Sequence, residues 1–241
     1  MTIVTVPVVV IARQPRGVDR SDATNPASGE AGASAAREYE RRRQAREARV
    51  KVRFGRRLGG AFLALSDEPS SQRAWARGAQ GERELAKILE TIPGICVLQD
   101  RRVPGTRANI DHIVIAPAGV FVVDAKLYAG EIRIRDVGGF LKRDERLFVG
   151  RQYCSALADK VVWQVEVVAR ALGSEDGPVP ITPVLCFVRG EWPLFRPPTV
   201  FRGVRLEGTR SIKSLVGIGS VMGPESIGRL FGLLEEQLPP A

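Results

Sequence analysis

The sequence predicts an α/β fold, in which a mixed β-sheet is flanked by helices and preceded by a basic, partly disordered N-terminal extension. Two observations carry this prediction. From residue 72 onward, apolar segments of strand length alternate with segments of helical periodicity. Residues 34–57, in contrast, are rich in alanine, arginine and glutamate and have almost no apolar stripe. We therefore expect an extension over residues 1–71 and one folded domain over residues 72–241.

The extension has three predicted parts. Residues 2–12 are apolar and β-branched, but Pro7 interrupts them and they are far shorter than the ~20 residues of a membrane span. Residues 13–33 are rich in small and polar residues without periodicity, which is typical of disorder. Residues 34–57 favour a helix that is exposed or bound to a partner. On this basis we expect a soluble cytoplasmic protein without an integral membrane segment.

The folded domain is expected to begin with a helix that ends at Pro93 and Gly94. A short strand over residues 95–98 and a basic loop over residues 101–108 follow. Two apolar strands come next, over residues 110–116 and 120–127, and the tight turn between them predicts an antiparallel hairpin. The apolar positions of the first helix are Trp75, Leu85, Ile88, Leu89 and Ile92.

The second half of the domain completes the mixed sheet and its helices. A strong apolar run over residues 181–188 predicts a central strand. The other expected elements are a strand over 131–135, an exposed hairpin over 140–149, a helix over 154–172, an extended segment over 203–206 and helices over 212–216 and 224–238.

The positive charge of the chain is concentrated in one segment. The formal net charge is +9, and residues 37–57 hold nine arginines and one lysine against three glutamates. Such a segment indicates contact with a polyanion, either nucleic acid or an acidic membrane surface. A solvated basic helix without a specific partner is the alternative. The arginines that we expect to bind nucleic acid here are Arg41, Arg42, Arg43 and Arg46.

Cysteine and histidine usage limits the metal chemistry. The chain has three widely spaced cysteines and one histidine, His112. The sparse cysteines argue against a disulfide framework and a cysteine-rich zinc site, and the single histidine excludes a site of several histidines within one chain. Any bound metal must be coordinated mainly by oxygen, which favours Mg²⁺ or Mn²⁺.

The second strand of the hairpin carries an acid and a base at its inner end. Asp124 and Lys126 are two residues apart, so they project from the same face of a strand that is otherwise apolar. A structural ion pair would explain them. Asp111 lies at an equal distance from the turn on the other strand, and cross-strand partners are about 5 Å apart. Two carboxylates this close repel each other unless a proton or a cation lies between them, so the pattern favours a divalent metal.

The leading helix adds a third carboxylate. Glu82 lies three residues before Leu85, on the apolar side of the helix. Gly78 and Gly81 on the preceding turn would allow this helix to approach another backbone closely. Taken alone, Glu82 is better explained as an acid that stabilises the first turn of a helix.

These pieces together resemble the nuclease-related domain, which is similar in fold and motif to the PD-(D/E)-x-K nucleases. The residues that carry the resemblance are the Gly-x-x-Gly-Glu of residues 78–82, Asn-Ile-Asp-His of residues 109–112 and Phe-Val-Val-Asp-Ala-Lys of residues 121–126. A fourth piece is Gln164 on the following helix. Two departures stand out: Ile110 replaces the proline of the superfamily motif, and the acid before the lysine is Asp124 rather than glutamate.

The resemblance implies a restriction-endonuclease-like core with a metal-dependent phosphodiesterase site. It implies that Mg²⁺ is bound by Glu82, Asp111, Asp124 and the Ala125 carbonyl. Lys126 would be the catalytic lysine, and Gln164 a supporting polar group.

We therefore expect a metal-dependent nuclease that acts on DNA more than on RNA, with the basic segment binding phosphates independently of sequence. The loop arginines Arg101, Arg102 and Arg107 are candidates for positioning phosphates. Asp111, Asp124 and the Lys126 amine should converge within roughly 5–7 Å. The rival interpretations are a nucleic-acid-binding module without turnover and a peripheral membrane or scaffold protein.

Overall fold

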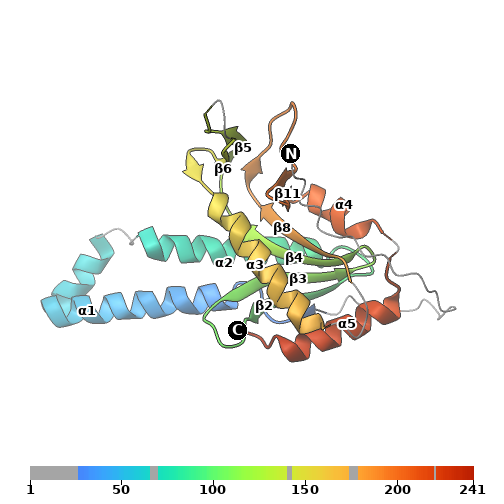
Figure 1. The fold of residues 1–241 in the computed structure, drawn as a ribbon. Helices are drawn as coiled ribbons and strands as arrows, with labels where there is room; N and C mark the ends of the chain where they lie inside the picture. Colours follow the sequence, from blue (N-terminus) through green and yellow to red (C-terminus); the bar gives the residue numbers. More distant parts are fainter. Residues whose placement is uncertain (1–26, 66–69, 140–142, 174–178, 220) are drawn as a thin grey trace.

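The structure, a computed structural model, describes residues 27–65, 70–139, 143–173, 179–219 and 221–241 (Figure 1). The expectations for residues 2–12 and for most of residues 13–33 lie outside the described part. The hairpin expected over residues 140–149 is described from residue 143 onward.

A seven-stranded mixed sheet forms the centre of the domain. The strand order is β1-β2-β3-β4-β8-β11-β10. Strand β4 pairs antiparallel with β3 and parallel with β8, and β8 pairs parallel with β11. The strands are β1 (Ala27–Ser28), β2 (Cys96–Arg102), β3 (Asn109–Ala116), β4 (Gly119–Lys126), β8 (Ile181–Phe187), β10 (Val200–Phe201) and β11 (Val204–Glu207).

Helices cover both faces of this sheet and bury it in two apolar layers. One layer contains α3 (Ser155–Leu172) and α5 (Pro224–Gln237), which pack on side chains such as Ile113 and Val122. The other contains α2 (Ser70–Leu89) and α4 (Ser211–Gly217), which pack on side chains such as Val114 and Val123. Alternate residues of each strand thus face different layers, as the pleat of a strand requires. The predicted α/β architecture is confirmed.

A smaller sheet stands apart from the central one (Figure 1). Its order is β7-β6-β5-β9. The strands are β5 (Gly130–Asp136), β6 (Glu145–Val149), β7 (Gln152–Tyr153) and β9 (Gly190–Glu191). Strand β5 follows β4 after only three residues, so this sheet lies beside the end of the hairpin that carries Lys126.

The first two helices form an antiparallel arm that projects from the domain (Figure 1). Helix α1 (Ala33–Leu65) begins one residue before the predicted basic helix and continues past residue 57. Its start is anchored to β2: the Ser34 N–H and hydroxyl donate to the Asp100 carboxylate at 2.6 and 2.7 Å. Asp100 lies within β2 at a positive φ of 48°, a conformation that is uncommon outside glycine. This clamp, Ser34 with Asp100, ties the arm to the central sheet.

Two sequence expectations for the front of the domain are wrong. Strand β2 runs to Arg102, so Arg101 belongs to a strand and not to the predicted basic loop. Trp75 was expected on the apolar side of its helix, but it is 39% exposed. It lies near the start of α2, which begins at Ser70.

No helix in the described ranges is both long and apolar enough to cross a membrane.

Candidate nuclease site

The β3–β4 hairpin places two aspartates opposite each other. The connecting turn is tight because Gly119 adopts a φ of 134°, where a Cβ would approach the Pro180 carbonyl oxygen to 2.6 Å. His112 pairs with Val123, so the next pair in the same register is Asp111 with Asp124. Cross-strand partners share a face, and both carboxylates therefore lie on the side covered by α3.

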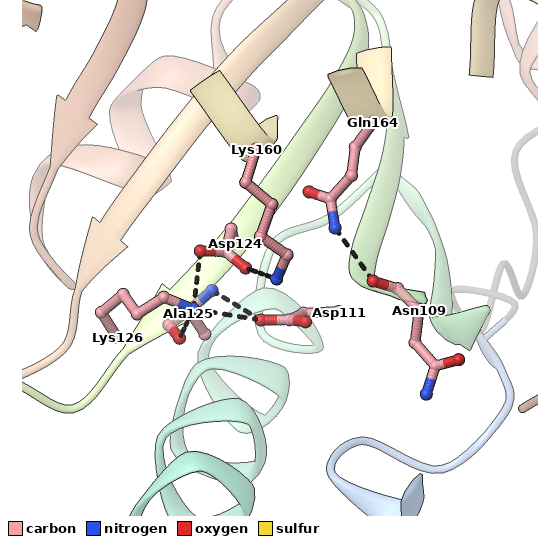
Figure 2. A network of polar contacts seen from close by, with 7 residues as sticks. All are labelled: Asn109, Asp111, Asp124, Ala125, Lys126, Lys160 and Gln164. Carbon is pink, nitrogen blue, oxygen red and sulfur yellow. Dashed lines mark hydrogen bonds and ion pairs between the residues drawn. The ribbon is translucent and has the colours of Figure 1, made fainter. Parts of the chain in front are cut away.

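Lys126 lies between these two acids. Its Nζ is 2.6 Å from Asp124 Oδ2 and 4.0 Å from Asp111 Oδ2. Asp111 is also tied to the opposite strand, because the Ala125 N–H donates to its Oδ2 at 3.1 Å (Figure 2). The Lys126 ammonium in turn donates to the Ala125 carbonyl at 3.2 Å. The three groups thus converge as the hairpin pattern predicts.

A second ammonium group, which the sequence analysis missed, contacts the same acid. Lys160 of α3 places its Nζ 2.9 Å from Asp124 Oδ1 (Figure 2). The signal available in the sequence was spacing: Lys160 precedes Gln164 by four residues and so shares its helix face. Both oxygens of Asp124 consequently face lysine.

Gln164 supports the neighbouring strand rather than the acids. Its side chain is fully buried, and its Nε2 donates to the Asn109 carbonyl at 2.9 Å (Figure 2). Asn109 is two residues before Asp111, so this bond fixes the start of β3 against α3. Gln164 Oε1 is buried without a hydrogen-bond partner among the described residues.

Helix α2 brings Glu82 to the same end of the sheet. A Cβ on Gly81 would lie 3.1 Å from Leu127 Cβ and 3.2 Å from its backbone nitrogen, so the absence of a side chain permits close approach to the chain just after Lys126. The expectation for Gly81 is therefore supported. The one for Gly78 is wrong, because a Cβ there would meet no atom within 4 Å.

The electrostatics of the site divide its acids into two kinds. Burial opposes the charge of Asp124, but Lys126 and Lys160 outweigh it and hold the pKa of Asp124 well below its ordinary value. The same attraction overcomes burial at Lys126 and raises its pKa above the usual range. Asp124 and Lys126 therefore form a charged pair, and Lys126 is an ammonium ion and a hydrogen-bond donor.

The other two acids are held toward their neutral forms. Burial and the charge of Asp124 raise the pKa of Asp111 to about 6. Burial, followed by the charges of Asp111 and Asp100, raises the pKa of Glu82 to about 9. Because these acids repel one another, a bound cation would stabilise their charged forms.

These groups line a cavity of about 730 Å³. Its walls include Glu82, Asp111, Lys126 and Lys160. The available donors are carboxylate oxygens and the Ala125 carbonyl, which suit Mg²⁺ or Mn²⁺. Asp124 Oδ2 faces the Lys126 ammonium at 2.6 Å, so a cation could bind this oxygen in place of the ammonium.

The donor chemistry fits a divalent cation, but the side chains are not arranged as a complete ligand set. Within the described residues, no group of three histidine, cysteine, aspartate or glutamate side chains is positioned to hold a metal ion. The Lys126 ammonium occupies the position beside Asp124 to which a metal cation would be attracted. A metal at Asp124 would therefore compete with this ammonium.

Among the predicted phosphate-binding arginines, Arg101 requires correction. It is fully buried, with Nη2 donating to Ser28 Oγ at 2.6 Å and lying 3.5 Å from Glu235 Oε1. Because its guanidinium points into the fold, it cannot reach a phosphate on the surface. Arg102 and Arg107 are exposed.

Three of the arm arginines form ion pairs with glutamates of the same helix, α1. Arg41 and Arg42 both bind Glu38, at 2.7 and 2.5 Å. Arg43 lies 3.6 Å from Glu40 and 3.4 Å from Glu47. Pairs of this kind on an exposed helix contribute little to stability and leave an excess of positive charge.

An α/β sandwich with two aspartates and a lysine at the end of a hairpin, approached by a buried glutamate, has the architecture of a nuclease-like domain. Residues 77–188 match the family model of the nuclease-related domain, the family that the sequence motifs resemble. The match extends from α2 through the hairpin and α3 to just beyond β8. No curated protein and no solved structure gave a match to the chain.

Proposed function

We propose that this protein is a divalent-metal-dependent nuclease that hydrolyses phosphodiester bonds, in DNA more than in RNA and without base preference. The observation that carries the proposal is the convergence of Asp111, Asp124 and Lys126 at one end of the hairpin, with Lys126 Nζ 2.6 and 4.0 Å from the two acids. Acid and ammonium groups in one cavity can bind a cation and a phosphate side by side.

Asp111, Asp124, Glu82 and the Ala125 carbonyl are the proposed ligands of Mg²⁺ or Mn²⁺. When bound, such a cation neutralises phosphate charge and makes an attacking water more acidic. The raised pKa values of Glu82 and Asp111 support this assignment, because a cation would stabilise their charged forms.

Lys126 acts in this proposal as a charged donor. Its pKa lies above the usual range, so it does not take a proton from water while it is paired with Asp124. It would instead donate hydrogen bonds to the attacking water or to a phosphoryl oxygen as negative charge develops. Gln164 holds the β3 strand that carries Asp111 in register with α3.

The test is a nicking assay on supercoiled plasmid DNA, with single-stranded circular DNA assayed in parallel as a second substrate. We expect cleavage with Mg²⁺ or Mn²⁺ and none with a chelator. Lys126→Ala should lower the rate by about 100-fold or more. Lys213→Ala is the control, because Lys213 lies on α4 and contacts Thr91 Oγ1, away from the site. Cleavage by Lys126→Ala at the wild-type rate would refute the proposed mechanism.

A second candidate function is a nucleic-acid-binding module without turnover. The observation that favours it is that both oxygens of Asp124 face an ammonium group, Lys126 on one side and Lys160 on the other. Tight DNA binding with no cleavage in any divalent metal would support it. For the membrane alternative, co-sedimentation with anionic rather than neutral liposomes is the discriminating measurement.

A further inference from the structure

The proposed active-site cavity continues into a second, arginine-lined groove. The second cavity has a volume of about 580 Å³ and lies between the start of α1, the nearby part of α2 and the β2–β3 loop. The two cavities share four lining residues, Ser34, Trp75, Arg107 and Asn109. We call the second cavity the arm groove.

Arginines line the arm groove from two opposing walls. Arg37, Arg41 and Arg42 come from α1, where positions 37 and 41 share a helix face. Arg102 and Arg107 come from the end of β2 and the loop after it. The lining includes one acidic side chain, Glu38, which pairs with Arg41 and Arg42, while Arg37 donates to the carbonyl oxygen of Ala241 in the same lining. The excess of guanidinium groups suits a run of phosphates.

An exposed indole lies where the two cavities meet. Trp75 is 39% exposed, and the Arg42 guanidinium carbon lies 5.6 Å from its ring centroid. A tryptophan among arginines matches the pairing of stacking platform and phosphate contacts by which proteins bind single-stranded nucleic acid. The flat face of a base is open to such stacking only when the base is not enclosed in a duplex.

We propose that the arm groove binds a single-stranded segment of nucleic acid, with Trp75 stacking on an unpaired base and the arginines contacting its phosphates. The inference rests on the proposed function, because the shared wall leads this strand toward Asp111 and Lys126. It assigns the substrate class of the site as single-stranded or locally unpaired nucleic acid.

The experiment measures binding separately from cleavage. Fluorescence anisotropy of a labelled oligothymidylate of about 12 nucleotides is recorded with the full chain in chelator, beside a duplex of the same length. We expect the single strand to bind more tightly than the duplex. Trp75→Leu should weaken single-strand binding about 5- to 100-fold, and Trp75→Phe should restore most of it.

A matched control exists on the small sheet. Tyr153 is 54% exposed, with the Arg146 guanidinium carbon 5.9 Å from its ring centroid, so it reproduces the arginine-over-aromatic arrangement outside the groove. Tyr153→Leu and Arg146→Gln should leave binding unchanged. Arg41→Gln and Arg107→Gln should each reduce the slope of log affinity against log salt concentration by the amount expected for the loss of about one phosphate contact.

Two results would overturn the inference: equal affinity for duplex and single strand, or an unchanged affinity in Trp75→Leu. Stacking also quenches indole fluorescence, so an equal quench in wild type and Trp75→Phe would count against it even if Trp75→Leu folded poorly. Failure of the proposed nuclease activity is a separate outcome. It would appear as an absence of nicking while Trp75-dependent binding persists.

Discussion

Two glycines one turn apart on α2 offer a direct test of how closely this helix approaches the site. In Gly81→Ala the new Cβ would lie 3.1 Å from Leu127 Cβ and 3.2 Å from Leu127 N, closer than ordinary van der Waals contact. In Gly78→Ala the new Cβ meets no atom within 4 Å. The two changes are otherwise alike, because both place alanine in the same helix.

The expected free energies follow from that difference. Alanine in place of glycine within a helix stabilises by about 1 kcal/mol. Overpacking against a neighbour costs about 1–3 kcal/mol. Gly78→Ala should therefore raise the free energy of unfolding by about 1 kcal/mol, and Gly81→Ala should leave it unchanged or lower it by up to about 2 kcal/mol.

Urea unfolding of the two variants beside wild type, in chelator, measures these values. Nicking by Gly81→Ala should also fall, because Leu127 directly follows Lys126 and must shift to accept the methyl group. If both variants were stabilised equally and cut DNA at the wild-type rate, the close approach of α2 to Leu127 would be refuted.

Three further predictions concern charge. The pKa of Glu82 is about 9 in the fold against an ordinary 4.5, so the stability that the protonated side chain contributes is present below pH 4.5 and is lost as the pH rises toward 9. Urea titrations in chelator should therefore find Glu82→Gln as stable as wild type at pH 4 and more stable by roughly 2–4 kcal/mol at pH 7.5. Lys160→Met removes an ammonium 2.9 Å from Asp124 and should tighten Mg²⁺ binding about 3- to 10-fold by calorimetry; weaker binding would contradict this. Glu235→Ala leaves the buried Arg101 guanidinium without its acid and should cost about 1–3 kcal/mol in urea unfolding, whereas Glu236→Ala should cost little.

The site could be predicted from sequence where it depends on local periodicity. Strand alternation places Asp124 and Lys126 on one face, and equal distances from the turn place Asp111 across from them. These relations hold for any regular hairpin with this turn. Lys160 could not be found in this way, because a polar residue on an amphipathic helix is ordinarily read as solvent-exposed. Its role depends on a flexible side chain reaching across from α3.

Arg101 was misplaced for a related reason. The Pro104-Gly105 turn signal and a run of charged residues favour a loop, yet β2 continues to Arg102. The strand can bury Arg101 because Ser28 and Glu235, from opposite ends of the chain, supply its partners. No local pattern encodes a contact between segments this far apart in sequence.

The Ser34–Asp100 clamp has a consequence for how the chain can be divided. Asp100 is 3% exposed, and its charge already contributes to the raised pKa of Glu82. A truncated chain that began at residue 72, the boundary expected from composition, would remove Ser34 with both donors to the Asp100 carboxylate, and also the β1 strand that pairs with β2. The truncation would lose two hydrogen bonds to a charged group, each worth about 1.5–3 kcal/mol, and would uncover the edge of β2. The start of the arm is therefore part of the fold, and a minimal stable fragment should keep both Ser34 and the β1 strand instead of beginning at residue 72.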